Sequence, residues 1–106
     1  LRNPERREEN YRKNHLRRKF GITPGVYDQM LCDQGGVCAV CRRPRSSRER
    51  LSVDHCHETG GVRGLLCGSC NRAMGLLGDS PEIIRGMLKY LSFYSIQSGS
   101  SALAVA

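Results

Sequence analysis

Residues 38–71 read CAVCRRPRSSRERLSVDHCHETGGVRGLLCGSCN and hold two Cys-x-x-Cys pairs, Cys38 with Cys41 and Cys67 with Cys70. The pairs are separated by 25 residues, 42–66. Two turns that each present two thiolates can close a tetrahedral four-sulfur site, the usual geometry of structural Zn²⁺. Disulfides or unconnected thiols are the alternative, and we favour zinc because thiols in an intracellular protein stay reduced.

The segment between the two cysteine pairs has room for a β-hairpin. Residues 51–57 and 62–66 have strand-like character, and Gly60-Gly61 supplies the loop between them. We therefore predict a small α+β fold in which zinc fixes the hairpin beside the start of the next helix.

The first predicted strand carries the densest group of chemically active side chains. Asp54, His55 and His57 offer a metal ligand, a proton acceptor near neutral pH and a second donor. Strand alternation puts the two histidines on one face and Asp54 on the other, so a shared site needs a twist or a bulge there. Asn71 follows the last cysteine and is expected to face Asp54 or His55. The oxygens of Asp54 and Asn71 favour Mg²⁺ or Mn²⁺ over zinc.

Two other interpretations of this group stay open from the residues alone. One is a second zinc site that uses His55, Cys56 and His57, although adjacent residues on a strand converge poorly on one ion. The other is a polar hairpin without chemistry. The two cysteines outside the pairs, Cys32 and Cys56, are interpreted as structural, and Cys32 as a small buried apolar residue.

Helices are expected on both sides of the hairpin, at residues 3–19, 24–34, 70–77 and 81–91. The last of these has an apolar stripe, which predicts that it packs on something. We divide the chain into a basic helical arm at 1–20, a zinc-containing domain at 21–91 and a flexible tail at 92–106. With 39% hydrophobic and 6% aromatic residues in 106, the core is small enough to need a further stabilising element, either disulfides or a structural metal.

The charge balance favours a polyanionic partner. The formal net charge is +7, and residues 1–20 hold eight Lys/Arg against three Glu. No signal peptide or apolar span is evident, which predicts an intracellular protein that does not enter a membrane. The chain begins at Leu1 rather than Met, which fits a fragment or a processed form of a longer protein.

Residues 35–78 closely resemble the recombination endonuclease VII family, within the wider HNH or ββα-metal nucleases, many of whose members are encoded by phages. The resemblance rests on C-x-x-C at 38–41, V-D-H-x-H at 53–57, V-R-G-L-L-C at 62–67 and C-x-x-C-N at 67–71. It implies a ββα-metal (His-Me finger) core and a metal-dependent endonuclease that hydrolyses DNA. It also implies that Cys38, Cys41, Cys67 and Cys70 hold zinc.

The same resemblance assigns the hydrolytic roles residue by residue. Asp54 and Asn71 would hold the catalytic Mg²⁺ or Mn²⁺, His55 would be the general base, and His57 would contact the scissile phosphate. None of these positions is substituted in this sequence.

Basic side chains near the motif are expected to contact the DNA backbone; they are Arg42, Arg43, Arg45, Arg48, Arg50 and Arg63. With few aromatics and no evident recognition helix, we expect nicking with weak sequence specificity or cleavage of branched DNA. The competing interpretation is a zinc-ribbon-like module that binds nucleic acid without cutting it. The sequence decides neither between a monomer and a homodimer nor which DNA structure is preferred.

Overall fold

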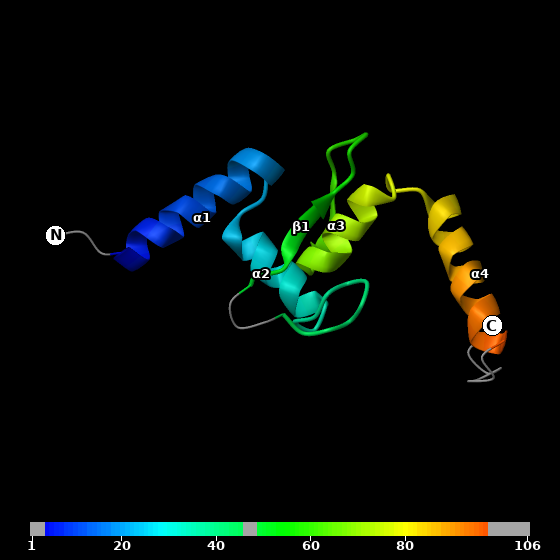
Figure 1. The fold of residues 1–106 in the computed structure, drawn as a ribbon. Helices are drawn as coiled ribbons and strands as arrows, with labels where there is room; N and C mark the ends of the chain where they lie inside the picture. Colours follow the sequence, from blue (N-terminus) through cyan, green and yellow to red (C-terminus); the bar gives the residue numbers. More distant parts are fainter. Residues whose placement is uncertain (1–3, 46–48, 98–106) are drawn as a thin grey trace. The chain divides into compact units, whose positions relative to one another are not determined.

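The computed structural model describes residues 4–45 and 49–97, which form a small α+β protein (Figure 1). The described elements are α1 (Pro4–Phe20), α2 (Pro24–Asp33), β1 (Ser52–His55), β2 (Val62–Leu66), α3 (Gly68–Leu76) and α4 (Pro81–Gln97). The chain divides into two compact units, one up to Asn71 and one from Arg72. The α+β prediction is confirmed, and the hairpin and its flanking helices lie close to their predicted positions.

The core of the first unit is very small. Its buried apolar side chains are Leu16, Tyr27, Cys38, Leu51, Val53, Leu65 and Leu66. Most come from the hairpin and its edges, and one of them is itself a cysteine of the first pair. A core of this size supplies little folding free energy, as the composition predicted.

The two strands are antiparallel, and their register shifts once. Asp54 pairs with Gly64 but His55 pairs with Val62, so Arg63 is the extra residue of a β-bulge. The shift lies at the step from Asp54 to His55. This is the step at which a twist or bulge was required if both side chains serve one site.

Helix α2 is attached to the hairpin at both of its ends. At its N-terminus Thr23 caps the helix, with its Oγ1 accepting from the Val26 N–H at 3.2 Å. The Tyr27 hydroxyl donates to the carbonyl of Leu51, just before β1. At the C-terminus Gln34 Nε2 donates to the Leu65 carbonyl at 2.9 Å, and Gln34 Oε1 accepts from the Leu65 N–H at 2.9 Å.

The Gln34 side-chain amide therefore hydrogen-bonds both backbone groups of Leu65, as a neighbouring strand would on this edge of β2. Its Nε2 also donates to the Val37 carbonyl at 2.8 Å, at the entry to the first cysteine pair. A Cβ at Gly64 would lie 3.4 Å from Gln34 Oε1, so the amide lies in close contact with this part of β2. One side chain thus joins α2, β2 and the first cysteine turn.

The second unit differs from the expectation in two ways. Helix α4 continues to Gln97 instead of ending at Leu91, so residues 92–97 are helical; the rest of the predicted flexible tail, 98–106, lies outside the described residues. The apolar stripe of α4 was expected to be covered, yet Ile83 and Met87 are each 50% exposed and Leu88 is 64% exposed. Residues 72–97 contain only the end of α3 and α4, which offer each other too little apolar surface.

Cys32 is another correction, because its side chain is exposed rather than buried. It lies in the last turn of α2, five residues after Tyr27, so helical periodicity turns it away from the side on which Tyr27 is buried. Among the described helices, none has the length and apolarity that crossing a membrane requires.

Candidate metal centre and hydrolytic site

The four paired cysteines form one cluster. The Sγ atoms of Cys38, Cys41, Cys67 and Cys70 all lie within 4.8 Å of one another, and Cys41 Sγ is 3.8 Å from Cys67 Sγ. A tetrahedral ion with Zn–S bonds of about 2.3 Å requires sulfur atoms roughly 3.8 Å apart. No disulfide joins the six cysteines. The donor set and its spacing therefore fit a structural zinc ion.

The first cysteine turn is shaped by its backbone. An isolated bridge pairs Val37 with Pro44, the Cys38 N–H donates to the Arg43 carbonyl at 3.0 Å, and the Arg42 N–H donates to the Cys38 carbonyl at 3.1 Å. Arg42 adopts a left-handed conformation with φ of 62°, which closes the turn. The Ala39 N–H then donates to the Leu65 carbonyl at 3.1 Å and ties this turn to β2.

The second pair stands at the start of α3. The Cys70 N–H approaches Cys67 Sγ at 3.4 Å, and the Asn71 N–H donates to the Cys67 carbonyl at 2.9 Å. Because β2 ends at Leu66, the hairpin delivers Cys67 directly to the cluster. Two turns that are distant in the sequence are therefore brought together through β2.

The surroundings of the cluster lower the pKa of the Cys38 thiol and raise that of the Cys70 thiol. Burial raises the pKa of Cys38, but hydrogen bonds from the Cys67, Cys41 and Val40 backbone outweigh it and lower this pKa to about 6. Burial, together with the neighbouring thiols, raises the pKa of Cys70 to about 12. Because each zinc ligand must be a thiolate, zinc binding would release the remaining protons of the cluster, and zinc affinity should fall as pH is lowered.

Arg43 lies beside this cluster. Its hydrogen bond to Cys41 is the main cause that raises the pKa of Arg43, and hydrogen bonds from Arg43 lower the pKa of Cys41. The sequence predicted Arg43 as a DNA contact. In the structure its guanidinium lies against the thiol cluster, where a positive charge offsets that of the thiolates.

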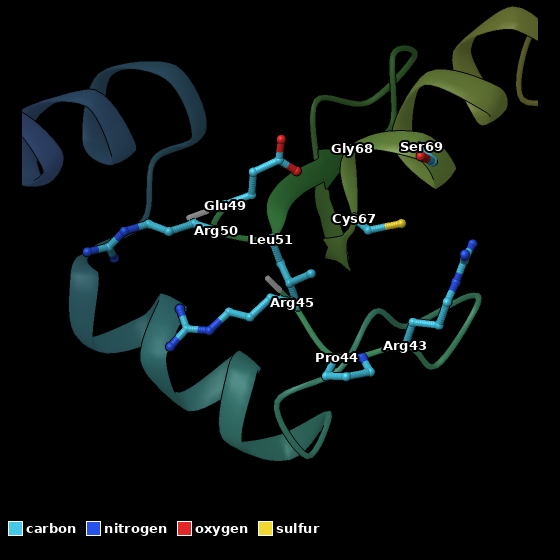
Figure 2. Close-up of a pocket in the computed structure, with 9 residues that line it drawn as sticks. All are labelled: Arg43, Pro44, Arg45, Glu49, Arg50, Leu51, Cys67, Gly68 and Ser69. Atoms are coloured by element: carbon cyan, nitrogen blue, oxygen red, sulfur yellow. The ribbon is translucent and has the colours of Figure 1, made fainter. Parts of the chain in front are cut away.

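A pocket of about 200 Å³ adjoins the cluster, lined by Arg43, Pro44, Arg45, Glu49, Arg50, Leu51, Cys67, Gly68 and Ser69 (Figure 2). The Arg45 and Arg50 side chains extend to one side of it, and Arg43 lies on the other side with Cys67 and Ser69 (Figure 2). The predicted DNA-contacting arginines therefore do not converge on one point. Arg48 lies outside the described residues, and Arg42 is exposed.

Asp54 and Arg63 form a bidentate ion pair across the hairpin. Arg63 Nε donates to Asp54 Oδ2 at 2.7 Å, and its NH2 group donates to Oδ1 at 3.0 Å. Asp54 is only 7% exposed, so its carboxylate needs a compensating charge. Arg63 is the extra residue of the bulge, and it supplies that charge. The sequence had predicted a DNA contact for Arg63.

The two histidines lie next to each other at the end of β1. The ring centroids of His55 and His57 are 4.9 Å apart, and the Phe20 ring lies 5.6 Å from His55. His55 is half-buried and His57 is exposed. The position of the His55 ring is therefore restricted by aromatic contacts from two different segments.

Asn71 occupies the first turn of α3 and is half-buried. Its backbone bond to Cys67 fixes it next to the second cysteine pair. A contact between its side chain and Asp54 or His55 stays a prediction.

Sequence reasoning missed three residues that shape this site. They are Gln34, Phe20 and, as a partner of Asp54, Arg63. A signal existed only for Arg63, since Asp54 and Arg63 have opposite charges and lie on the two strands of one predicted hairpin.

Comparison with known proteins adds independent information. The profile of the family described as recombination endonuclease VII matches residues 13–93. Two phage proteins, the Gene 59 protein of Mycobacterium phage L5 and that of Mycobacterium phage D29, are each 45% identical to this chain over 73 residues. The match covers 68% of this chain and 44% of each relative, so the chain spans less than half the length of these relatives.

Proposed function

The chain belongs to the recombination endonuclease VII family, and from this premise we propose that it is a metal-dependent DNA endonuclease with a ββα-metal core. One observation carries the proposal. A buried carboxylate, Asp54, and a half-buried imidazole, His55, follow each other at a β-bulge, beside a helix whose start is held by the cysteine cluster.

His55 is the proposed general base. It would remove a proton from a water molecule, which attacks the phosphorus in line with the departing 3′ oxygen. The contacts with the Phe20 and His57 rings restrict its rotation, so the imidazole nitrogen is held in place before substrate arrives.

Asp54 and Asn71 are the proposed ligands of a catalytic Mg²⁺ or Mn²⁺. When bound, such a cation offsets the charge that develops on the phosphoryl oxygens and the leaving group. Asp54 fits this role because it is a buried carboxylate directly before His55, and the Arg63 guanidinium that engages its oxygens would have to give way to the cation. Oxygen donors from a carboxylate and an amide match what these ions prefer.

His57 is the proposed phosphate contact. It is exposed while its ring stays 4.9 Å from that of His55, so it can donate a hydrogen bond to a phosphate bound next to the base. DNA would approach this side of the hairpin, and exposed arginines such as Arg42, Arg45 and Arg50 would contact the backbone farther along.

A second function, a zinc-dependent module that binds nucleic acid without cutting it, is favoured by one observation. Both carboxylate oxygens of Asp54 are engaged by Arg63. If that ion pair persists when DNA and a divalent cation are present, the positive charge of Arg63 opposes a cation on Asp54.

The test is cleavage of supercoiled plasmid by the zinc-loaded chain with Mg²⁺, with Mn²⁺ or with no added cation. The reaction without added cation is the matched control, because a chelator would also remove structural zinc. We expect nicking that depends on the added cation and is lost in His55→Ala. DNA binding without cleavage in every condition would contradict the endonuclease proposal and favour the module that binds nucleic acid without cutting it.

A further inference from the structure

The rings of α1 form a line that leads to the proposed base. Tyr11 stacks on His15 with ring centroids 5.9 Å apart, and His15 meets Phe20 edge-on at 6.2 Å. Phe20 in turn lies 5.6 Å from His55. A continuous series of ring contacts therefore connects the middle of α1 with the site at the end of β1.

The same face of α1 is hollowed by an open groove. It has a volume of about 470 Å³ and is lined by Tyr11, Asn14, His15, Arg18 and Lys19. These positions follow the spacing of one helical face. All five side chains are exposed, and the Lys19 ammonium lies 5.6 Å from the centroid of Phe20, so the groove combines aromatic surface with positive charge.

The charge of α1 is uneven along its length. All its acidic residues, Glu5, Glu8 and Glu9, precede Tyr11, and the half from Tyr11 to Phe20 contains none. Within this half, Arg12 is bound to Asp28 at 3.0 Å and lies 5.1 Å from the Tyr27 ring, so it attaches α1 to α2.

Helix α1 is thus held in place on a different face from the groove. Leu16 is 6% exposed and Arg12 makes the contacts to α2, whereas Arg18 and Lys19 remain on the exposed groove face. A fixed helix whose exposed face carries two cations and two rings differs from a solvated charged arm.

We propose that this groove binds the DNA segment that flanks the cleaved phosphodiester. Arg18 and Lys19 contact backbone phosphates, and the Tyr11 and His15 rings pack on the deoxyriboses of the same strand. From Tyr11 to Phe20 the helix rises roughly 14 Å, which spans roughly four phosphates of one strand. The inference rests on the proposed function, because it takes His55 as the position of the cut.

The test measures binding and not cleavage. Fluorescence anisotropy would measure the affinity of the zinc-loaded chain for a labelled duplex of about two helical turns, roughly 20 base pairs. The measurement is repeated over a range of salt concentrations, without added Mg²⁺ or Mn²⁺. One double variant, Arg18→Gln with Lys19→Gln, removes the groove charges. Its matched control, Arg6→Gln with Arg7→Gln, removes the same charge from the same helix outside the groove.

We expect the groove variant to reduce the slope of log K against log salt by about 2, because two phosphate contacts are lost. The control should change the slope by less than half of that. Tyr11→Ala should weaken binding by about threefold or more, because the apolar contact of the ring with the deoxyribose is lost, and Tyr11→Phe should restore it. Equal slopes in the two double variants, or equal affinity of Tyr11→Ala and wild type, would overturn the proposal.

The outcome is separable from that of the proposed function. A wild type that cuts plasmid while both double variants behave alike refutes the groove and leaves the endonuclease. A wild type that binds but never cuts refutes the endonuclease, and the two slopes still decide whether the groove holds DNA. If the zinc-loaded chain binds an acidic peptide but does not bind duplex DNA, the DNA proposal is wrong.

Discussion

The four-cysteine cluster and the Asp54–His55 region lie close together in the sequence, but they are built in opposite ways. Each cysteine pair is positioned by one tight turn, and the four sulfurs lie within 4.8 Å of one another, with Cys41 Sγ and Cys67 Sγ 3.8 Å apart. The hydrolytic side chains depend on long-range contacts: Arg63 from the other strand engages Asp54, and Phe20 from α1 restrains His55. Local turns shape each cysteine pair and β2 brings the two pairs together, whereas the second region depends on side chains contributed by other segments.

The largest expected effect comes from breaking the cluster. Cys67→Ser removes one zinc ligand, and because zinc binding supplies about 10–16 kcal/mol in small zinc domains, the variant should be unfolded. Far-UV circular dichroism and zinc content would measure this. Cys32→Ser is the matched control, since Cys32 is an exposed thiol outside the cluster. A Cys67→Ser protein as well folded as Cys32→Ser would contradict structural zinc.

The second effect concerns the rate and leaves the fold intact. His55→Ala should lower plasmid cleavage by about 10²–10⁴-fold, the usual contribution of a general base. Zinc content and thermal unfolding should stay close to those of the wild type, because the His55 ring is only half-buried and lies outside the apolar core. Cleavage at the wild-type rate would remove His55 from the mechanism.

The third effect links the two strands of the hairpin through Arg63. Arg63→Gln leaves the buried Asp54 carboxylate without its guanidinium, which should lower the free energy of unfolding by about 2 kcal/mol after allowance for the partly exposed arginine. If Asp54 is a cation ligand, Mn²⁺ should then raise the thermal midpoint of Arg63→Gln more than that of the wild type. Arg50→Gln, which removes an exposed arginine, is the control. Equal Mn²⁺ effects in all three proteins would argue against a cation on Asp54.

The smallest effect is at Tyr27. Tyr27→Phe removes the hydrogen bond to the Leu51 carbonyl and should cost about 1 kcal/mol. Burial raises the pKa of Tyr27 above its usual 10.0, although Arg50, Arg12 and Arg45 oppose this shift. The stability that depends on the protonated hydroxyl is therefore complete below pH 10.0 and is lost as pH rises through the folded-state pKa.

Urea unfolding at neutral and alkaline pH would measure this difference. We expect the wild type and Tyr27→Phe to converge in stability as pH rises above the usual tyrosine pKa of 10.0, since the phenylalanine of the variant has no proton to lose. A constant difference across the whole range would show that the hydroxyl does not titrate with unfolding.

The sequence predicted the features that depend on spacing over short distances. The cysteine pairs, the hairpin and the family resemblance are all confirmed. An irregularity near Asp54 was expected only on the condition that Asp54 and His55 serve one site, because alternation along a strand places consecutive side chains on opposite faces; the register shifts at this step. Which residue forms the bulge could not be deduced, since that depends on the partner strand.

The features that were missed or wrong depend on contacts between distant segments. The bonds between Gln34 and Leu65 join residues 31 positions apart, and nothing in the pattern around Gln34 distinguishes it from an ordinary helix end. Cys32 was expected to be buried on residue type alone, and the apolar stripe of α4 was expected to be covered on periodicity alone. Periodicity identifies an apolar face, but it does not say what lies against that face.

The Gln34 contact makes one backbone amide a reporter of tertiary structure. The Leu65 N–H is held by the side chain that follows α2 and not by a neighbouring strand, so its hydrogen exchange with solvent measures how often α2 separates from the hairpin. Amides elsewhere in β2 report on the opening of the hairpin itself. The protection of the Leu65 amide relative to its rate in an unfolded chain would therefore give the free energy of this separation in the native protein, without a mutation and without denaturant.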